Sequence, residues 1–208
     1  MIRVHHLERS RSQRVLWLLE ELGVDYEVVR HARDPVTQRA PAALRAVHPL
    51  GKSPVIVDGD VVLAESGAIV DYLVVRHGRG ALAPHHDDAD FPRYLYWLHF
   101  AEGSGMFPLL LDLFLGMAGD GAAPLRDAVG AEIDALLAFL ERELEGREWL
   151  LGARFSAVDP LVSFVAEFAS TRRDLAAHPN VRAWLERAHA RPAYQASLKR
   201  AGVPYAYA

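Results

Sequence analysis

Strand patterns in this 208-residue chain are confined to roughly its first 80 residues, and this asymmetry limits the folds it can adopt. Up to Gly78, short apolar runs bounded by turn residues alternate with helical stretches. After Phe91, apolar residues recur at helical spacing. A Gly-, Pro- and acid-containing segment at 79–90 separates the two parts. We therefore predict an α+β protein with two domains, residues 1–80 and residues 88–208, the second all-helical.

The first domain shows the element order β-α-β-α-β-β-α. Predicted strands cover residues 2–6, 26–29, 54–57 and 60–63, and predicted helices cover residues 13–22, a short stretch ending near 48, and 66–76. Asp58-Gly59 between two apolar runs predicts a β-hairpin. In the second domain a long helix begins near Phe91-Pro92, and we expect Pro108 to bend it.

The chain contains no cysteine, which excludes disulfides, thiolate metal sites and a protein cysteine nucleophile. Any thiol chemistry must therefore use a thiol that arrives with a ligand. The net charge of −4 argues against a nucleic-acid partner. We see no signal peptide and no apolar stretch of the ~18 residues that a membrane span needs, so a cytoplasmic protein is expected.

The first local signal is Ser53-Pro54, immediately before a predicted strand. A proline at a strand start donates no N–H. If the peptide bond is cis, the Ser53 backbone can turn outward and pair with a peptide-like ligand. Taken alone, the dipeptide favours an ordinary trans proline at a sheet edge.

The second signal is Glu65-Ser66 at the start of a predicted helix. Ser66 and nearby backbone N–H groups could hold a carboxylate, and Glu65 could pair with an ammonium group. Together they suit the zwitterionic head of an amino acid. Taken alone, simple helix capping by Ser66 is the better interpretation.

The third signal is Ser10, between the first strand and the first helix. A hydroxyl there can donate to a thiolate near the positive end of a helix, which lowers the thiol pKa. The competing interpretation is an N-cap, but Ser12 is the better cap for a helix beginning near Gln13, which leaves Ser10 free.

Taken together, these signals resemble the glutathione transferase superfamily, closest to theta-like bacterial and fungal members. The matching stretches are Ser10-Arg11-Ser12-Gln13-Arg14-Val15-Leu16, Gly51-Lys52-Ser53-Pro54-Val55, Asp58-Gly59-Asp60, and residues 63–73 (LAESGAIVDYL). Residues 152–159 and Arg191-Pro192-Ala193-Tyr194 resemble the family's helical domain. The resemblance covers nearly the whole chain.

The resemblance implies a thioredoxin-like N-terminal domain followed by an all-α helical bundle, with Pro54 in cis. It implies that the Ser53 backbone pairs with the cysteinyl part of glutathione, the co-substrate. Glu65 and Ser66 would hold the γ-glutamyl head, and Lys52 would lie near the glycine carboxylate. A homodimer is implied as well.

The catalytic residues implied are Ser10, whose hydroxyl supports the thiolate, and Arg11, a cation beside it that could matter more. The thiolate would attack a small hydrophobic electrophile. Met106, Phe107 and Leu110 could line its pocket, and they are equally good core residues. Peroxidase activity toward organic hydroperoxides is a second expected activity. A non-catalytic ligand-binding or protein-interaction module with the same fold stays open as the alternative.

Two other patterns suggest chemistry but favour structure. Ser156-Ala157-Val158-Asp159 is similar to a capping box, so we expect Asp159 to stabilise a helix start and its loss to cost about 1–2 kcal/mol. His5-His6 and His85-His86 are adjacent pairs, and neighbouring strand side chains point to opposite faces. We therefore expect no metal.

Overall fold

The computed structural model describes residues 1–202 of the chain. These residues form two compact units, the first made of residues 1–85 and 189–202 and the second of residues 86–188. The sequence predicts domains at 1–80 and 88–208. Helix 192–201, placed in the second domain by sequence order, packs within the first unit.

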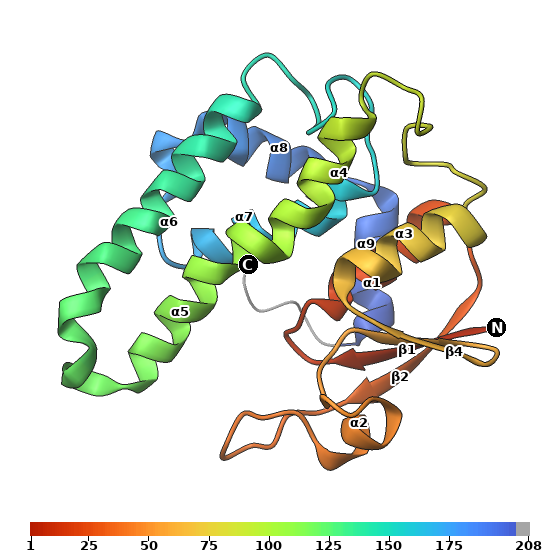
Figure 1. The fold of residues 1–208 in the computed structure, drawn as a ribbon, viewed down its shortest axis with the longest axis horizontal. Helices are drawn as coiled ribbons and strands as arrows, with labels where there is room; N and C mark the ends of the chain where they lie inside the picture. Colours follow the sequence, from red (N-terminus) through yellow and green to blue (C-terminus); the bar gives the residue numbers. More distant parts are fainter. Residues whose placement is uncertain (203–208) are drawn as a thin grey trace. The chain divides into compact units, whose positions relative to one another are not determined.

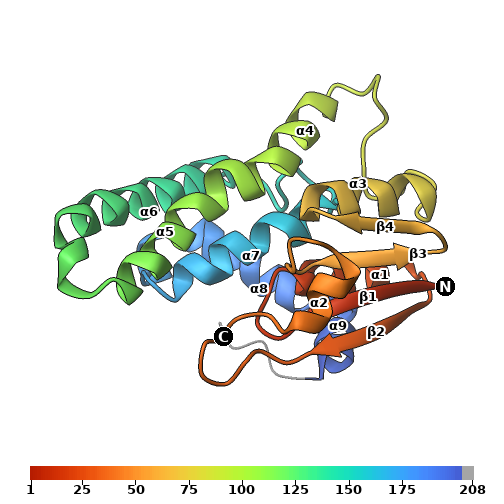
Figure 2. The same ribbon diagram turned by 60° about the horizontal axis from the view of Figure 1, so that its bottom comes forward.

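The first unit contains the predicted β-α-β-α-β-β-α order (Figure 1). Its elements are β1 (Ile2–Leu7), α1 (Ser12–Leu22), β2 (Tyr26–His31), α2 (Ala42–Val47), β3 (Val55–Asp58), β4 (Val61–Ala64), α3 (Ser66–Arg76) and α9 (Pro192–Ala201). The strand order in the sheet is β2-β1-β3-β4 (Figure 2). β1 and β2 run parallel, whereas β3 is antiparallel to both β1 and β4.

Apolar side chains fix the position of α1 in the first unit. Val15, Leu16, Leu18 and Leu19 are fully buried on this helix, which packs against β1, α3 and α9. Gly23 ends the helix in the left-handed conformation (φ 63°), as its sequence position indicates. The start of α1 is thereby held at the carboxyl end of β1.

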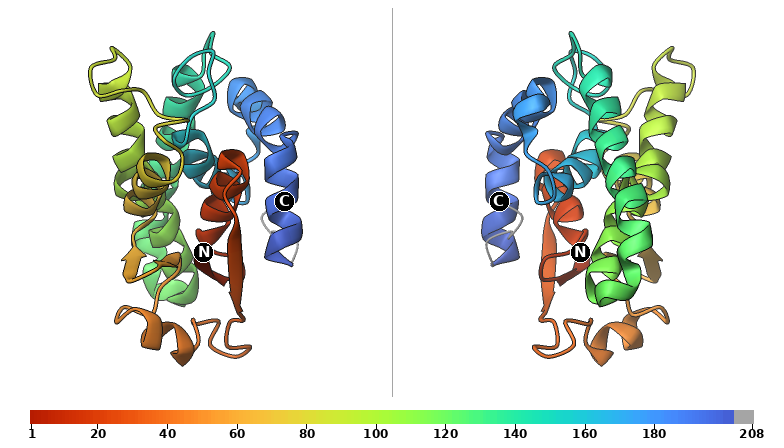
Figure 3. Two further views of the ribbon diagram at one scale, coloured as in Figure 1. Left: turned by 90° about the vertical axis from the view of Figure 1, so that its right-hand side faces the viewer. Right: turned by 90° about the vertical axis from the view of Figure 1, so that its left-hand side faces the viewer.

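Helix α9 is fastened to α1 by polar and aromatic contacts. The Gln13 amide donates to the Ser197 hydroxyl at 2.8 Å, and the Arg191 guanidinium makes two hydrogen bonds to the Glu21 carboxylate at 2.6 and 2.7 Å. The Trp17 and Tyr194 rings meet edge to face at 5.0 Å. Figure 3 shows α9, in blue, beside the red N-terminal elements.

The second unit is helical. Its elements are α4 (Phe91–Phe100), the π-helix η1 (Ala101–Gly105), α5 (Met106–Met117), the short η2 (Gly119–Ala122), α6 (Ala123–Glu143), α7 (Val158–Ser170), the short η3 (Leu175–Ala177) and α8 (Pro179–His189). α7 is the central helix, because every residue from Val158 to Ala169 is buried.

The long helix predicted from Phe91 is interrupted earlier than expected. The sequence places a bend at Pro108, but the structure puts a π-helical turn over Ala101–Gly105, three residues before it. Pro108 cannot donate to the carbonyl of Ser104, and its ring would crowd that carbonyl in a regular α-helix. The wider π-turn relieves this conflict ahead of the proline.

The run Phe91–Met117 is long and apolar enough to qualify as a membrane span by length and composition, although no span was predicted from the sequence. Core helices pass the same criterion. Tyr94, Trp97, Met106 and Leu109 on this run are buried, and its segments pack against α6 and α7. The core of the second unit therefore accounts for the buried apolar side chains of this run, whereas Phe107, Phe114 and Met117 on the same run are exposed.

Candidate active site

The loop from β1 into α1 carries Ser10, which is 8% exposed. Its Oγ lies 2.8 Å from the Ser12 Oγ and accepts a hydrogen bond from the Ser12 N–H at 3.3 Å. The predicted N-cap at Ser12 is wrong. α1 begins at Ser12 itself, with Arg11 in the cap position and no side-chain cap. Ser12 instead turns inward, and Ser10 is engaged with it and not free.

The partner of Ser12 inside the unit is His6 of β1. The Ser12 Oγ lies 2.8 Å from the His6 Nδ1 and 3.4 Å from the Leu7 carbonyl oxygen. Burial, together with the smaller effects of the Arg30 and His31 charges, lowers the pKa of His6 to about 4. His6 is therefore a neutral imidazole at physiological pH.

His5 faces the other way, as adjacent strand residues must. Its Nδ1 lies 3.1 Å from the Nε2 of His31, and the two rings stack at 5.3 Å. Burial lowers the pKa of both imidazoles. Within residues 1–202, three potential metal ligands lie close together in the linker. They are His85, His86 and Asp87, and all three are exposed.

The Ser53-Pro54 peptide bond is cis. The Ser53 hydroxyl donates to the His5 carbonyl at 2.8 Å and accepts from the Leu7 N–H at 3.4 Å. The Ser10 Oγ lies 3.5 Å from the Ser53 Oγ. Two residues 43 positions apart in the sequence, predicted separately, therefore meet at the end of β1.

Glu65 and Ser66 stand at the start of α3. Glu65 is exposed and has φ 71° and ψ 120°, a conformation that side chains with a Cβ rarely adopt. Ser66 is 3% exposed and does not cap the helix. The first turn bond runs from the Ile69 N–H to the Glu65 carbonyl, so the N–H groups of residues 66–68 have no partner within the helix. Such a helix start favours an anion.

The other predicted residues differ in where they lie. Lys52 is exposed and Arg11 is half-buried, both in the first unit. Met106, Phe107 and Leu110 lie in the second unit at the start of α5. Met106 is 1% exposed, Phe107 is 64% exposed and Leu110 is half-buried. Met106 is thus a core residue of that unit, and a pocket role for the three stays a prediction.

Sequence reasoning overlooked His6 and Ser12 as parts of this site. The sequence pattern favours a helix cap at Ser12 and an alternating strand position at His6. No spacing rule links them, because their contact depends on how α1 packs against β1. The pattern Ser10-x-Ser12 directly after a strand was the available signal.

Known proteins match both units. The family model described as the glutathione S-transferase N-terminal domain matches residues 1–75, and the one for the C-terminal domain matches residues 105–192. Glutathione S-transferase 3 of Schizosaccharomyces pombe is 34% identical over 213 aligned residues, covering 93% of this chain and 85% of that protein.

Solved structures agree with these matches. A glutathione S-transferase from Actinobacillus pleuropneumoniae has a TM-score of 0.91 at 33% identity, covering 100% of this chain and 95% of that one. A sphingomonad glutathione S-transferase complexed with glutathione has a TM-score of 0.79 at 27% identity, covering 97% and 99%.

The mixed four-stranded sheet with its cis-proline, followed by a helical unit, defines the glutathione-transferase fold. This chain belongs to the glutathione S-transferase family, and it is an enzyme of the transferase class. The resemblance to the glutathione transferase superfamily is thereby confirmed.

Proposed function

We propose that this enzyme conjugates the thiolate of glutathione to small hydrophobic electrophiles. The observation that carries the proposal is the meeting of Ser10 and Ser53 beside the cis-Pro54 bond, with their hydroxyl oxygens 3.5 Å apart. A peptide ligand whose cysteine pairs with the Ser53 backbone would bring its sulfur to the hydroxyl of Ser10.

The remaining groups suit the two ends of glutathione. The free N–H groups at the start of α3 and the Ser66 hydroxyl would hold the α-carboxylate of the γ-glutamyl head, with Glu65 pairing with its ammonium group. The exposed Lys52 would hold the glycine carboxylate. Met106, Phe107 and Leu110 remain our candidates for the electrophile pocket.

The chemistry follows from the pKa of the thiol, about 8.5 when free. A hydrogen bond donated by Ser10, the nearby start of α1 and the Arg11 cation all favour the charged thiolate. The thiol S–H bond breaks and its proton passes to solvent. The sulfur then forms a C–S bond to the electrophilic carbon, and the halide of a halogenated substrate leaves to solvent with the electron pair of the broken carbon–halogen bond. Reduction of an organic hydroperoxide to its alcohol and water, with two glutathione molecules oxidised to the disulfide, is a second activity to be assayed.

The decisive test compares wild type with Ser10→Ala, following the ultraviolet absorbance of bound glutathione thiolate against pH. We expect a bound-thiol pKa well below the free value in wild type. In Ser10→Ala it should rise, and kcat/KM for a halogenated nitrobenzene should fall about ten- to a hundredfold. Ser170→Ala removes a hydroxyl that bonds to the Glu167 carbonyl in the second unit and serves as the matched control.

Each outcome assigns a role. A depressed thiol pKa that ignores Ser10→Ala would transfer the role to Arg11 or the helix start, and Arg11→Gln would separate these two. Glutathione binding without any depression of the thiol pKa would favour a non-catalytic ligand-binding module.

Assembly and location are also proposals. The family resemblance favours a cytoplasmic homodimer with glutathione and the electrophile as its small-molecule partners. Analytical ultracentrifugation at several protein concentrations checks the dimer, since a monomer at all of them would contradict it.

A further inference from the structure

A chain of polar contacts leads from Ser10 into the interior of the first unit. The Ser10 Oγ lies 2.8 Å from the Ser12 Oγ, which lies 2.8 Å from the His6 Nδ1. These side chains are 8%, 0% and 3% exposed. The chain thus begins at the proposed thiolate site and ends on a neutral, buried imidazole.

The tautomer of His6 influences which way the Ser10 hydroxyl points, because each hydroxyl has only one proton to donate. Ser12 has one hydroxyl proton. If the His6 Nδ1 is bare, Ser12 donates to it and can bond to Ser10 only by accepting the Ser10 proton. The Ser10 hydroxyl then points inward, and its proton is not available for a hydrogen bond to a ligand.

The opposite tautomer reverses the chain. With a proton on Nδ1, His6 donates to Ser12. The Ser12 proton can then go to the Ser10 Oγ at 2.8 Å or to the Leu7 carbonyl at 3.4 Å, and the shorter contact favours Ser10. The Ser10 oxygen then accepts from both the Ser12 hydroxyl and the Ser12 N–H, which fills its two lone pairs. The Ser53 proton is already given to the His5 carbonyl. The remaining internal acceptor for the Ser10 proton is the Ser53 Oγ at 3.5 Å, a distance well beyond that of an ordinary O–H···O bond. A thiolate at normal hydrogen-bond distance would therefore be the better acceptor.

We propose that His6 is a positioning residue for Ser10, holding the Nδ1–H tautomer so that the Ser10 hydroxyl donates to the glutathione thiolate. The inference rests on the proposed function and extends it to a residue that does not touch the ligand. No proton passes through His6, because the thiol proton leaves to solvent. His6 acts by orientation alone, which suits an imidazole kept uncharged by burial.

The experiment measures the pKa of bound glutathione thiol in wild type, His6→Leu, His6→Asn and Ser10→Ala, and in the double variant His6→Leu/Ser10→Ala. We expect His6→Leu to raise the bound-thiol pKa by about half a unit to one unit. His6→Asn carries an amide N–H near the position of Nδ1 and should recover most of the shift.

Two controls separate orientation from general damage. Binding of S-methyl glutathione, which has no ionisable thiol, should change less than about twofold in His6→Leu, because no contact to the ligand is removed. In the Ser10→Ala background, His6→Leu should add nothing, because the hydroxyl it orients is absent. Ser12→Ala breaks the chain at its middle, should raise the thiol pKa similarly, and carries the test if His6→Leu does not fold.

Three results would overturn the inference. The first is that His6→Leu leaves the pKa of the bound thiol unchanged although Ser10→Ala raises that pKa. Another is a shift in the double variant equal to the sum of the single shifts, since His6 would then act independently of Ser10. In either case the proposed function survives. An undepressed thiol pKa in wild type would refute both the function and the inference.

Discussion

Asp159 illustrates how much one buried side chain can hold together. It is completely buried, and its Oδ1 accepts from the Leu150 N–H at 3.0 Å and from the Trp184 indole at 3.1 Å. Its Oδ2 accepts from the N–H and the hydroxyl of Ser156 at 2.9 and 3.0 Å. The capping-box prediction is half correct, because the Ser156 hydroxyl donates to Asp159 and does not cap a backbone N–H.

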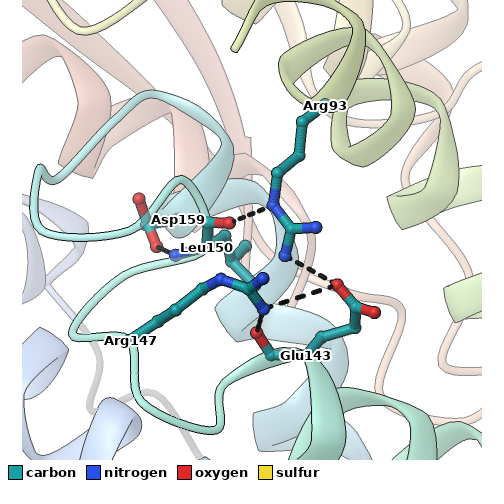
Figure 4. A network of polar contacts seen from close by, with 5 residues as sticks. All are labelled: Arg93, Glu143, Arg147, Leu150 and Asp159. Carbon is teal, nitrogen blue, oxygen red and sulfur yellow. Dashed lines mark hydrogen bonds and ion pairs between the residues drawn. The ribbon is translucent and has the colours of Figure 1, made fainter.

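The network extends beyond the helix start that the sequence suggested. Leu150 also accepts a hydrogen bond from the Arg93 guanidinium at 2.7 Å, and Arg93 pairs with Glu143 at 2.6 Å (Figure 4). Asp159 thus fixes the start of α7 and the loop before it, and through Leu150 it connects to α4 and α6.

Asp159→Ala should therefore cost more than the 1–2 kcal/mol of a lost cap. Four buried donors lose their acceptor, and the relief from burying a carboxylate offsets part of that loss, which leaves about 3 kcal/mol at pH 7. Urea unfolding measures this. Ser156→Ala, which removes one of the four donors, should cost about 1 kcal/mol. A loss of activity at unchanged stability would contradict a structural role.

The same variants predict a pH effect. Burial raises the pKa of Asp159 to about 6, with its four hydrogen bonds opposing the shift. A raised folded-state pKa gives stability that is complete below about pH 4 and is lost as the pH rises through about 6. The stability gap between wild type and Asp159→Ala should therefore be about 1 kcal/mol larger at pH 5 than at pH 7.

Among the elements, the π-helix η1 approaches α7 closely. A Cβ built on Gly105 would lie 3.1 Å from the Val165 Cγ1 and 3.2 Å from the Phe100 carbonyl oxygen. A Cβ on Gly103, in the same turn, would meet nothing within 4 Å. The two glycines form a matched pair that separates crowding from helix propensity.

Gly105→Ala should lower the free energy of unfolding by about 1–2 kcal/mol, because the new methyl group overpacks the contact with Val165. Gly103→Ala should leave stability unchanged or raise it by up to about 1 kcal/mol, because alanine favours a helix. Thermal unfolding of both variants checks this. If both variants change the unfolding temperature equally, the close approach to α7 is not the reason why residue 105 must be glycine.

At the scale of the whole molecule, the chain returns to its beginning. α9 lies more than 100 residues beyond the sheet in sequence, yet it covers α1 through Gln13, Trp17 and Glu21. The first unit therefore depends on residues from both ends of the described chain. Sequence order places α9 in the helical domain, whereas its packing places it in the first unit, which contains the sheet.

Tyr194→Ala tests this assignment. Tyr194 is 5% exposed and packs against the Trp17 and His189 rings at 5.0 and 4.6 Å, so its loss should cost about 3 kcal/mol. Hydrogen exchange should accelerate in α1 more than in α7. Faster exchange confined to residues 86–188 would place α9 with the helical unit instead.

The sequence by itself determined the order of the strands and helices, the hairpin at Asp58-Gly59, the helix end at Gly23 and the family. These depend on local spacing, turn chemistry and motifs, which a linear pattern records. The same local information points to Ser10, Ser53, Glu65 and Ser66, and their roles are proposals.

The tertiary structure alone decided the rest. The contact of His6 with Ser12, the inward turn of Ser12 and the attachment of α9 to α1 join residues whose separation follows no period. The π-turn three residues before Pro108 and the close approach of its Gly105 to Val165 of α7 are likewise not recorded in any linear pattern. Patterns along a chain report which face of an element is apolar, whereas hydrogen-bond partners and register depend on which elements finally meet.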